Sequence, residues 1–336
     1  MFGLTWLTFL SAASFSYVIQ LRSAEKKLSI RTLVTHIFPV AEWGSKSTRI
    51  DVLMYVASKF IGGIFAGVNL ATTAGMAGIT SFLIDSGFPN HPVYDYNVAT
   101  IILWSLMFFV LTDFANYLTH YLQHFVPVLW ELHKVHHSAT FLTPFTTKRM
   151  HPFGDQFDGL VAAAIGGVAL GLGRSLNGFT LPQMLVMIAN ANLIGTILVL
   201  DSLRHSHFPV GFGPLDKVIL SPHMHQLHHS YKVEHWDTNF GNKLSIWDRL
   251  FGTLVEPRKG ESFPWGLGKA EDADYHTLAG VYFLPLIKIG RLLRGLPSYR
   301  DPSAPVTAPA PFFDRVFFRK PAHFGKQPNP SAPQPY

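Results

Sequence analysis

The sequence predicts an all-α integral membrane protein, a helical bundle of about four to five spans with a helical cap on its cytoplasmic side. Hydrophobic residues make up 48% of the 336 residues and charged residues only 14%. Soluble domains carry roughly 25% charged residues, and the mean hydropathy of +0.21 departs from them in the same direction. Because the apolar residues are gathered in long runs, a membrane bundle explains this composition better than a soluble domain.

The basic residues of the chain lie beside its first apolar runs. The net charge is +6 and the isoelectric point about 9.4. A nucleic-acid-binding protein would show a basic stripe interleaved with aromatic residues, whereas cytoplasmic loops of membrane proteins carry Lys and Arg beside the spans. We therefore expect no nucleic-acid partner and place the basic segment 22–49 in the cytoplasm. The residues concerned are Arg22, Lys26, Lys27, Arg31, Lys46 and Arg49.

Three apolar runs predict helices in the first 120 residues. Residues 2–20 follow no positive region, so we favour a retained span with its N-terminus outside over a cleaved signal peptide in residues 1–21. Residues 51–85 exceed the roughly 20 residues of one span, and we interpret them as one long helix with a re-entrant extension. Turn-forming residues follow at 86–92, and the next span covers residues 98–117.

The second half of the chain contains an apolar pair and two weaker segments. Residues 157–173 and 178–200 predict a helical hairpin through the bilayer, which returns the chain to the cytoplasm. Residues 278–290 are too short to span and are expected at the membrane interface. The Pro-, Ala- and Ser-rich tail is expected to be disordered. The expected parts are an N-terminal span with a basic segment (1–50), a membrane domain (51–260), an interfacial segment (261–301) and the tail (302–336).

The histidines of the chain are concentrated in its middle. The chain has no cysteine, which excludes disulfides, thiolate catalysis and iron–sulfur clusters. Of the 17 histidines, 13 fall between His120 and His235. His120 and His124 are four residues apart, and residues 133–137 and 225–229 both read H-x-x-H-H. Positions i, i+3 and i+4 of a helix project from one side, so imidazoles of one turn can converge on a metal ion.

A bound metal explains these histidines better than separate structural roles do. Eight imidazoles beside apolar spans would be costly to dehydrate without a common partner. One zinc ion takes about four ligands, so eight suggest two ions, and imidazole suits zinc, copper, iron and nickel. No H-E-x-x-H is present, which argues against a zinc protease. The alternatives are a membrane zinc hydrolase and a metal transporter, but transporters place their ligands near the bilayer midplane rather than at span ends.

The histidine boxes stand in a longer pattern over residues 110–255. Its segments are D-F-A-N-Y-L-T-H-Y-L-Q-H (113–124), L-H-K-V-H-H-S (132–138), R-M-H-P (149–152), R-H-S-H (204–207), S-P-H-M-H-Q-L-H-H-S (221–230), D-T-N-F-G (237–241) and W-D-R-L-F-G-T (247–253). In order and spacing they resemble the fatty acid hydroxylase/sterol desaturase superfamily of membrane di-iron enzymes. The resemblance implies two iron ions, O₂ as co-substrate, and hydroxylation or desaturation of a C–H bond of a membrane lipid such as a sterol or fatty acyl chain.

The resemblance also implies roles for individual residues. The expected metal ligands are His120, His124, His133, His136, His137, His205, His225, His228 and His229. Asp201 and His207 are candidates to complete the metal shell, and Asp113 is expected to accept an N–H of a ligand imidazole. His151 is expected either to form a structural turn or to line the site. The remaining candidates for positions behind the ligands are His223, Asp237 and Asn239.

The electrons for such a reaction must come from another protein. The chain shows no G-x-G-x-x-G motif with a following acidic residue, and H-P-F-G at 151–154 is not the H-P-G-G of a fused cytochrome b5 domain. We therefore expect a separate ferredoxin or cytochrome b5-type donor with its reductase. No oligomeric state is predicted.

Overall fold

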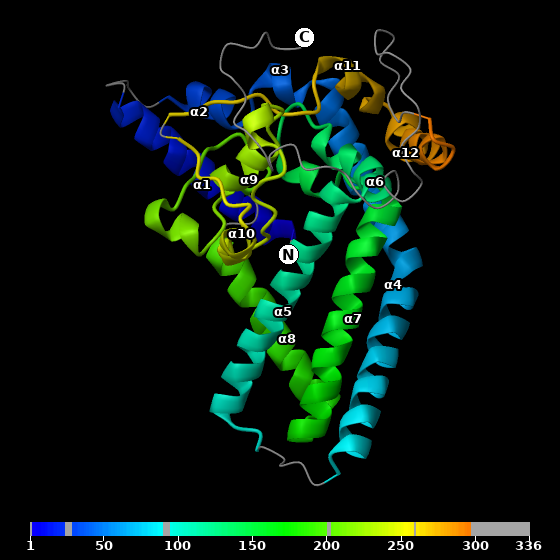
Figure 1. Ribbon diagram of the computed structural model, residues 1–336. Helices are drawn as coiled ribbons and strands as arrows, with labels where there is room; N and C mark the ends of the chain where they lie inside the picture. The colour runs from blue at the N-terminus through cyan, green and yellow to red at the C-terminus, as the bar shows by residue number, and fades with distance from the viewer. Residues whose placement is uncertain (1, 24–28, 90–94, 200–202, 259, 297–336) are drawn as a thin grey trace.

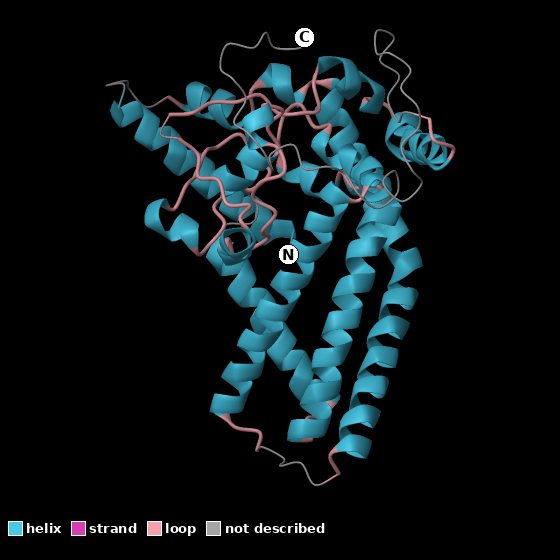
Figure 2. Ribbon diagram, in the orientation of Figure 1, coloured by secondary structure: helices cyan, strands magenta, loops and turns pink. Residues whose placement is uncertain are grey.

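The computed structural model describes residues 2–23, 29–89, 95–199, 203–258 and 260–296. Across these ranges the regular elements are helices, joined by loops with two isolated β-bridges, as Figure 2 shows. The long helices form a bundle at one end of the molecule, and the shorter helices form a cap at the other (Figure 1). The predicted all-α class is therefore confirmed.

Three helices of the bundle are long and apolar enough to cross a membrane. They are α4 (Lys46–Gly87), α5 (Val98–Phe125) and α7 (Pro152–Asn177). Apolar side chains cover the outside of α4, where Phe60 is 76% and Ile64 is 73% exposed. Such a surface suits contact with lipid tails rather than water. The total number of spans, expected to be four or five, stays a prediction.

Helix α8 (Leu181–Val199) completes the bundle. The left-handed Gly178 (φ 62°) ends α7, and α8 then turns back and packs across α5. Gly suits this position because a left-handed backbone strains residues with a Cβ atom. The apolar pair predicted at 157–200 therefore forms two helices joined by a short turn, and its passage through the bilayer as a hairpin stays a prediction.

Small residues allow α4 and α7 to pack closely. A Cβ atom on Gly167 would lie 2.6 Å from the carbonyl oxygen of Thr73, and one on Gly171 would lie 2.6 Å from that of Ala77. Without a hydrophobic driving force between helices in lipid, this close backbone contact supplies much of the attraction. The predicted re-entrant extension is wrong, because α4 is one continuous helix of 42 residues. An unbroken helix satisfies its own backbone, which a lipid-exposed re-entrant turn does not.

The cap consists of short helices around the upper ends of α5 and α7 (Figure 1). Helix α1, which covers the span predicted at 2–20, packs on the cap through Phe9 and Ala13 against Ile37, Leu203 and Phe208. The other elements are α2 (Ile30–Ile37), α3 (Val40–Trp43), α6 (Pro127–His137), η1 (Pro144–Lys148), η3 (Gly213–Lys217), α9 (Pro222–His228), η4 (Val233–His235), α10 (Ile246–Phe251), α11 (Lys269–Asp272), η5 (Ala273–Tyr275) and α12 (Leu278–Leu293), after α1 (Phe2–Ser23).

A fully buried ion pair joins the cap to α4. The Arg149 guanidinium lies 2.7 Å from the carboxylate of Asp51, and neither side chain is exposed. Arg149 also donates to Ser47, Ser138 and the carbonyl of Tyr275. A buried charge is tolerated when it is paired and its donors are satisfied, so this arginine fixes four segments to one another.

The C-terminal segment is described in part. The apolar piece predicted at 278–290 forms α12, whose Tyr282 carbonyl accepts a hydrogen bond from His151 Nε2 at 3.0 Å. This contact holds α12 near the start of α7. The tail at 302–336 lies outside the described residues, and the four predicted parts of the chain stay predictions.

Candidate metal centre

The structure brings all nine histidines that were predicted as ligands to the junction of bundle and cap. Helix α5 extends beyond the predicted span end and carries His120 and His124 on its last turns. Helix α6 carries three histidines and α9 two, with His229 at the C-terminal cap of α9 and His205 in the loop before η3. Four separate segments thus supply the imidazoles.

The nine histidines form two groups whose ring nitrogens lie within 4.8 Å of one another inside each group. Group one is His120, His124, His133, His137 and His228, and group two is His136, His205, His225 and His229. The groups are neighbours, because the stacked rings of His137 and His229 have centroids 4.7 Å apart. The arrangement therefore suits two adjacent metal ions.

Each H-x-x-H-H box is divided between the groups. On α6 the i, i+4 pair His133 and His137 faces group one, and His136 faces group two. On α9 the corresponding pair, His225 and His229, belongs to group two, and the middle histidine to group one. A helix turns by about 100° per residue, so positions i and i+4 nearly eclipse while i+3 and i+4 diverge. The box spacing therefore suits two ions better than one.

The distances between ring nitrogens fit metal ligation. In group one His137 Nε2 lies 3.1 Å from Nε2 of both His124 and His228. In group two His205 Nε2 lies 2.9 Å from His225 Nε2 and 3.1 Å from His136 Nε2. Two nitrogens bound at right angles to one ion, with bonds of roughly 2.1 Å, would lie roughly 3 Å apart.

Several of these nitrogens are buried with no hydrogen-bond partner. Both ring nitrogens of His133 are in this state, as is Nε2 of His120. The side chain of His133 is only 3% exposed. A buried polar atom without a partner costs about 1–3 kcal/mol, and ligation of a metal ion would remove that cost. The residues present therefore fit a metal centre.

One ring nitrogen of several of these histidines is held by the protein. His120 Nδ1 donates to the carbonyl of Phe240 at 2.8 Å, and His228 Nδ1 to that of Thr238 at 2.6 Å. His124 Nδ1 contacts the carboxylate of Asp237 at 3.3 Å. These contacts fix the tautomer that leaves Nε2 free for a metal. Asp237 thus lies behind His124, while the two carbonyls leave no signal in the sequence because every residue has one.

Burial keeps the histidines of the cap neutral. It lowers the pKa of His136 to about 3, with His120, Arg204 and Arg149 adding to the effect. The pKa of His137 and of His229 is likewise well below the usual 6.5, first through burial and then through neighbouring histidines. Neutral imidazoles have the lone pair that a metal requires.

Asp113 does not have the contacts predicted for it. Its carboxylate accepts the backbone N–H groups of Lys243 (2.7 Å) and Leu244 (3.1 Å) and the indole N–H of Trp247 (2.9 Å). It thus anchors residues 243–247 to α5 instead of accepting from an imidazole. Seven residues bring Asp113 to the same helix face as His120 but about 10 Å further down the axis, too far for a hydrogen bond to that ring.

The other candidates lie around the two groups rather than in them. His151 caps the start of α7, accepting from Phe153 N–H, which is the structural alternative of the two predicted. His207 Nε2 donates to the His36 carbonyl at 2.9 Å. His223 stacks on Phe263. Asn239, with φ 54°, holds the carbonyls of Met224 and Val255. Asp201 lies outside the described residues.

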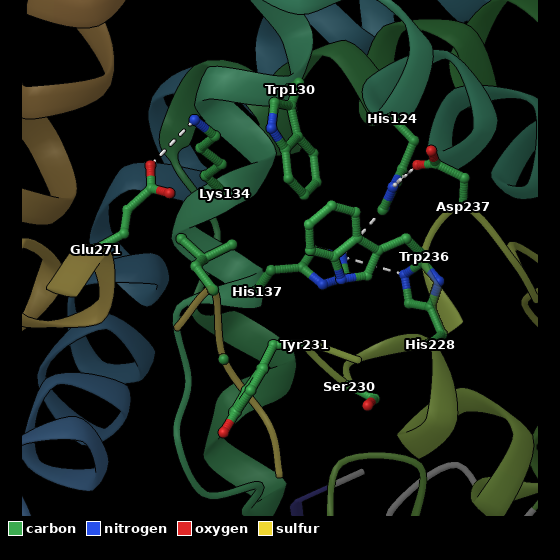
Figure 3. Close-up of a pocket in the computed structure, with 12 residues that line it drawn as sticks. His124, Trp130, Lys134, His137, His228, Ser230, Tyr231, Trp236, Asp237 and Glu271 are labelled. Carbon is green, nitrogen blue, oxygen red and sulfur yellow. Dashed lines mark hydrogen bonds and ion pairs between the residues drawn. The ribbon is translucent and has the colours of Figure 1, made fainter. Parts of the chain in front are cut away.

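Two cavities reach the histidines from different sides. The span-side cavity, of about 310 Å³, lies between the upper ends of α5 and α7 and touches His120 and His133 of group one and His136, His205 and His225 of group two. The cap-side cavity, of about 180 Å³, touches group one alone. Figure 3 shows the cap-side cavity, where Trp130, Tyr231 and Trp236 surround the converging rings of His124, His137 and His228.

The cap-side cavity ends at a charged cluster that sequence reasoning did not identify. Lys134 Nζ lies 3.1 Å from Glu271 and 2.9 Å from Glu131, and Lys288 Nζ lies 2.9 Å from Glu271 (Figure 3 shows the first pair). Lys134 stands inside the box L-H-K-V-H-H, so its charge was visible, but its partner in α11 is 137 residues away. Sequence spacing cannot reveal such a long-range pair.

Comparison with known proteins agrees with this geometry. The fatty acid hydroxylase family model matches residues 105–253, which contain both histidine groups. Ornithine lipid hydroxylase OlsE of Rhizobium tropici is 34% identical over 158 residues, 47% of this chain and 44% of that protein. Alkylglycerol monooxygenase of Xenopus tropicalis is 24% identical over 245 residues (68% and 51%). Delta(7)-sterol 5(6)-desaturase of Eremothecium gossypii is 30% identical over 159 residues (46% and 38%).

The extent of these matches is limited. The chain spans about half the length of these relatives or less. No solved structure matches it. The matched segment nevertheless includes most of α5, all of α6, α7, α8 and α9, and every histidine of the two groups. Residues 105–253 thus match a fatty acid hydroxylase domain, the part of the chain that carries both histidine groups.

Proposed function

We propose that this protein is an O₂-dependent oxygenase with two iron ions, which hydroxylates or desaturates a C–H bond of a membrane lipid. One observation carries the proposal: two adjacent groups of histidines lie where a bundle with membrane-spanning helices meets its cap. Similarity to hydroxylases, a monooxygenase and a desaturase favours iron among the metals that imidazole suits. When bound, the two ions would supply the activation of O₂.

The reaction balances with an external source of electrons. Hydroxylation converts one C–H bond, O₂, two electrons and two protons into C–OH and one water. Desaturation removes two hydrogens from adjacent carbons, and the same two electrons and two protons then complete two waters from O₂. We propose a separate ferredoxin or cytochrome b5-type protein with its reductase as the electron donor, because the chain lacks the corresponding motifs.

The residues of this chain would position the ions and shape the access to them. His120, His124 and His228 are fixed by Phe240, Asp237 and Thr238, so their Nε2 atoms stay aimed into group one. Such pre-orientation strengthens metal binding, since no rearrangement is needed. The span-side cavity touches both groups and opens between two spans, so we assign it to the lipid.

The same proposal gives the protein a place in the cell. We infer an integral membrane protein whose histidine groups lie on the cytoplasmic side. The basic segment 29–49, which precedes and begins α4, lies at the cap end of that helix (Figure 1). Lys and Arg beside a span favour the cytoplasm. The active site would then be on the side where soluble electron donors are found.

Metal content and oxygen incorporation test the proposal together. Protein purified in mild detergent after growth with ample iron is expected to hold about two irons per chain, as two groups require. Under ¹⁸O₂ and reductant, membranes that contain it are expected to yield a lipid with one ¹⁸O atom, or an alkene with labelled water. Tightly held zinc without iron, and no O₂ consumption after reconstitution with iron, would instead indicate a hydrolase. Iron or zinc moving across proteoliposomes would indicate a transporter.

A further inference from the structure

The side chains that line the span-side cavity are more polar than those expected around a hydrocarbon chain. Among the described residues that line it, only Met150 and Phe240 have apolar side chains. The polar lining residues outside the histidine groups include Asn116, Thr119, Gln123, Asp158, Arg204 and Asn242. Sites for apolar ligands are lined mainly by apolar side chains, and polar groups lose hydrogen bonds to water when a hydrocarbon covers them. The lining therefore suits the head of a lipid better than the middle of its tail.

Asp158 is the most unusual member of this lining. It lies on α7, a helix apolar enough to cross a membrane, where a carboxylate is expensive and commonly functional. Its Oδ1 accepts a hydrogen bond from Gln123 Nε2 of α5 at 2.9 Å, and the Thr119 hydroxyl also interacts with the carboxylate. Asp158 thus faces α5 across the mouth of the cavity.

The carboxylate of Asp158 has capacity for a further donor. When it is ionised, the carboxylate has about four lone-pair sites, of which the hydrogen bond from Gln123 occupies one. Because a carboxylate only accepts hydrogen bonds, its natural ligand is a hydroxyl or an amine. The five histidines on the cavity wall place any such ligand next to both groups.

We propose that Asp158 binds a hydroxyl or amino group in the polar head of the lipid substrate, and that oxidation takes place in or next to that head. This inference rests on the proposed function. The head occupies the polar cavity beside the histidines, and the tail leaves between α5 and α7 toward the apolar surface of the bundle. The oxidised C–H bond then belongs to the head or to the first carbons of the chain, with the same balance of O₂, electrons and protons as above.

A binding experiment tests the role of Asp158 without turnover. The probes are a monoacylglycerol, whose head has two hydroxyls, and its dimethyl ether, which has the same chain and no donor. Dissociation constants are measured for the full chain and for Asp158→Asn in the same detergent, so that partitioning into micelles cancels in the ratio. We expect the substitution to weaken binding of the monoacylglycerol about tenfold, the size of one charge-assisted hydrogen bond, and to leave the ether unchanged.

A matched control separates binding from a structural tie between α5 and α7. Asp155 lies about one turn earlier on α7 and on the wall of the same cavity, but its carboxylate is 3.6 Å from Lys148 Nζ. Asp155→Asn is expected to change both dissociation constants less than about twofold, since its carboxylate already has a cationic partner. If Asp158→Asn weakens both lipids equally, or if the ether binds the full chain as well as the monoacylglycerol does, the proposed role of Asp158 is overturned.

The position of the inserted oxygen gives the second readout. Iron-loaded protein is supplied with the monoacylglycerol, reductant and ¹⁸O₂, and the product is fragmented in a mass spectrometer. Label in the fragment that holds the head and first carbons is the expected result, and label further down the chain overturns the inference while it supports the oxygenase. If no lipid is labelled although the donor-dependent binding is present, the proposed function fails and the head-group site stands.

Discussion

At the scale of single residues, the direction in which each imidazole presents one ring nitrogen depends on the group that holds its other ring nitrogen. His120 and His228 donate to backbone carbonyls, and His124 contacts the Asp237 carboxylate. A ring with one nitrogen so held presents the other nitrogen in a fixed direction. The residues behind these histidines would therefore decide how strongly each group holds an ion.

Removal of one group-two histidine should release metal. His136→Ala deletes a buried imidazole whose Nε2 lies 3.1 Å from His205 Nε2. We expect the iron content to fall from about two per chain to about one or less, because three imidazoles would remain in group two. His207→Ala is the control, since His207 lies outside both groups. Elemental analysis of the purified variants measures the iron content per chain. Two irons retained in His136→Ala would exclude His136 as a ligand.

Asp237 offers a test of the support behind a ligand. Its backbone is left-handed, with φ 55°, a conformation that Asn adopts readily. Asp237→Asn therefore keeps the loop shape while it removes the charge beside His124. Loss of such a partner weakens metal affinity about 10–100-fold, which competition with a chelator measures. An unchanged affinity would mean that the carboxylate plays no part in orienting the ring.

At the scale of elements, two kinds of contact hold the helices together. In the bundle, α7 packs on α4 through Gly167 and Gly171, with backbone against backbone. In the cap, a charged cluster links α6 to α11 and α12 through Glu271. The packing of α7 on α4 depends on side-chain volume, so a larger side chain should disturb it. The contacts of Glu271 depend on charge, so a change of pH should disturb them.

The glycine contact predicts a contrast between neighbouring positions. Gly171→Ala places a methyl group 2.6 Å from the Ala77 carbonyl, whereas at Gly166 no atom lies within 4 Å. Overpacking costs roughly 1–3 kcal/mol, so Gly171→Ala is expected to lower Tm by several degrees. Gly166→Ala should leave Tm unchanged or raise it slightly, since Ala is the better helix former. Thermal unfolding in one detergent compares the two, and equal Tm values would contradict the tight contact.

The charged cluster predicts a pH dependence. Burial raises the pKa of Glu271, but Lys134 and Lys288 outweigh it and leave the pKa below the usual 4.5. A depressed carboxyl pKa contributes stability that is present above pH 4.5 and is lost as the pH falls below it. Glu271→Gln should therefore destabilise the protein by about 1–3 kcal/mol near pH 7.

The difference between the wild type and Glu271→Gln should shrink as the pH falls below 4.5. Denaturant unfolding at a series of pH values measures this difference. Lys217→Gln serves as a control, because its contact with Glu256 is long, at 3.9 Å, and exposed on both sides. A difference that stays constant from pH 7 to pH 3.5 would show that folding does not lower the pKa of Glu271.

At the scale of the whole molecule, the histidine groups lie where separate parts of the chain meet. Their histidines come from α5, α6, the segment at His205 and α9. These segments lie between residues 120 and 229 of the chain. The Arg149–Asp51 pair adds α4 from the other side of α6. Bound metal would therefore cross-link the bundle to the cap.

Metal removal should consequently loosen the whole fold. A ligand that binds only the folded state stabilises it by about 4 kcal/mol at 1,000 times its dissociation constant. We expect a chelator to lower Tm by several degrees in the wild type and by less in His136→Ala, which starts with less metal. Differential scanning measurements with and without chelator provide the comparison. The same Tm shift in both proteins would indicate an effect unrelated to group two.

Much of this organisation follows from the sequence alone. Apolar runs are local, so residues 98–117 and 157–200 predicted α5, α7 and α8, although α5 continues to His124. Histidine spacing is local too, and all nine predicted ligands lie in the two groups. The helical class and the family resemblance follow from these same patterns, because periodicity and order along the chain depend only on near neighbours.

Only the tertiary structure decided how the parts combine. The division of each H-x-x-H-H box between two groups, the contact of Asp237 with His124, and the anchoring of residues 243–247 by Asp113 all join residues far apart in the sequence. The packing of α4 along α7 likewise joins segments that are far apart in the sequence. In the sequence, Asp158 is a single charge within an apolar run. Only the fold places Gln123 of α5 within hydrogen-bond distance of its carboxylate. The local sequence determines which side chains share a helix face, because helix periodicity involves only near neighbours. Which residues that face contacts depends on how the helices pack in the folded chain.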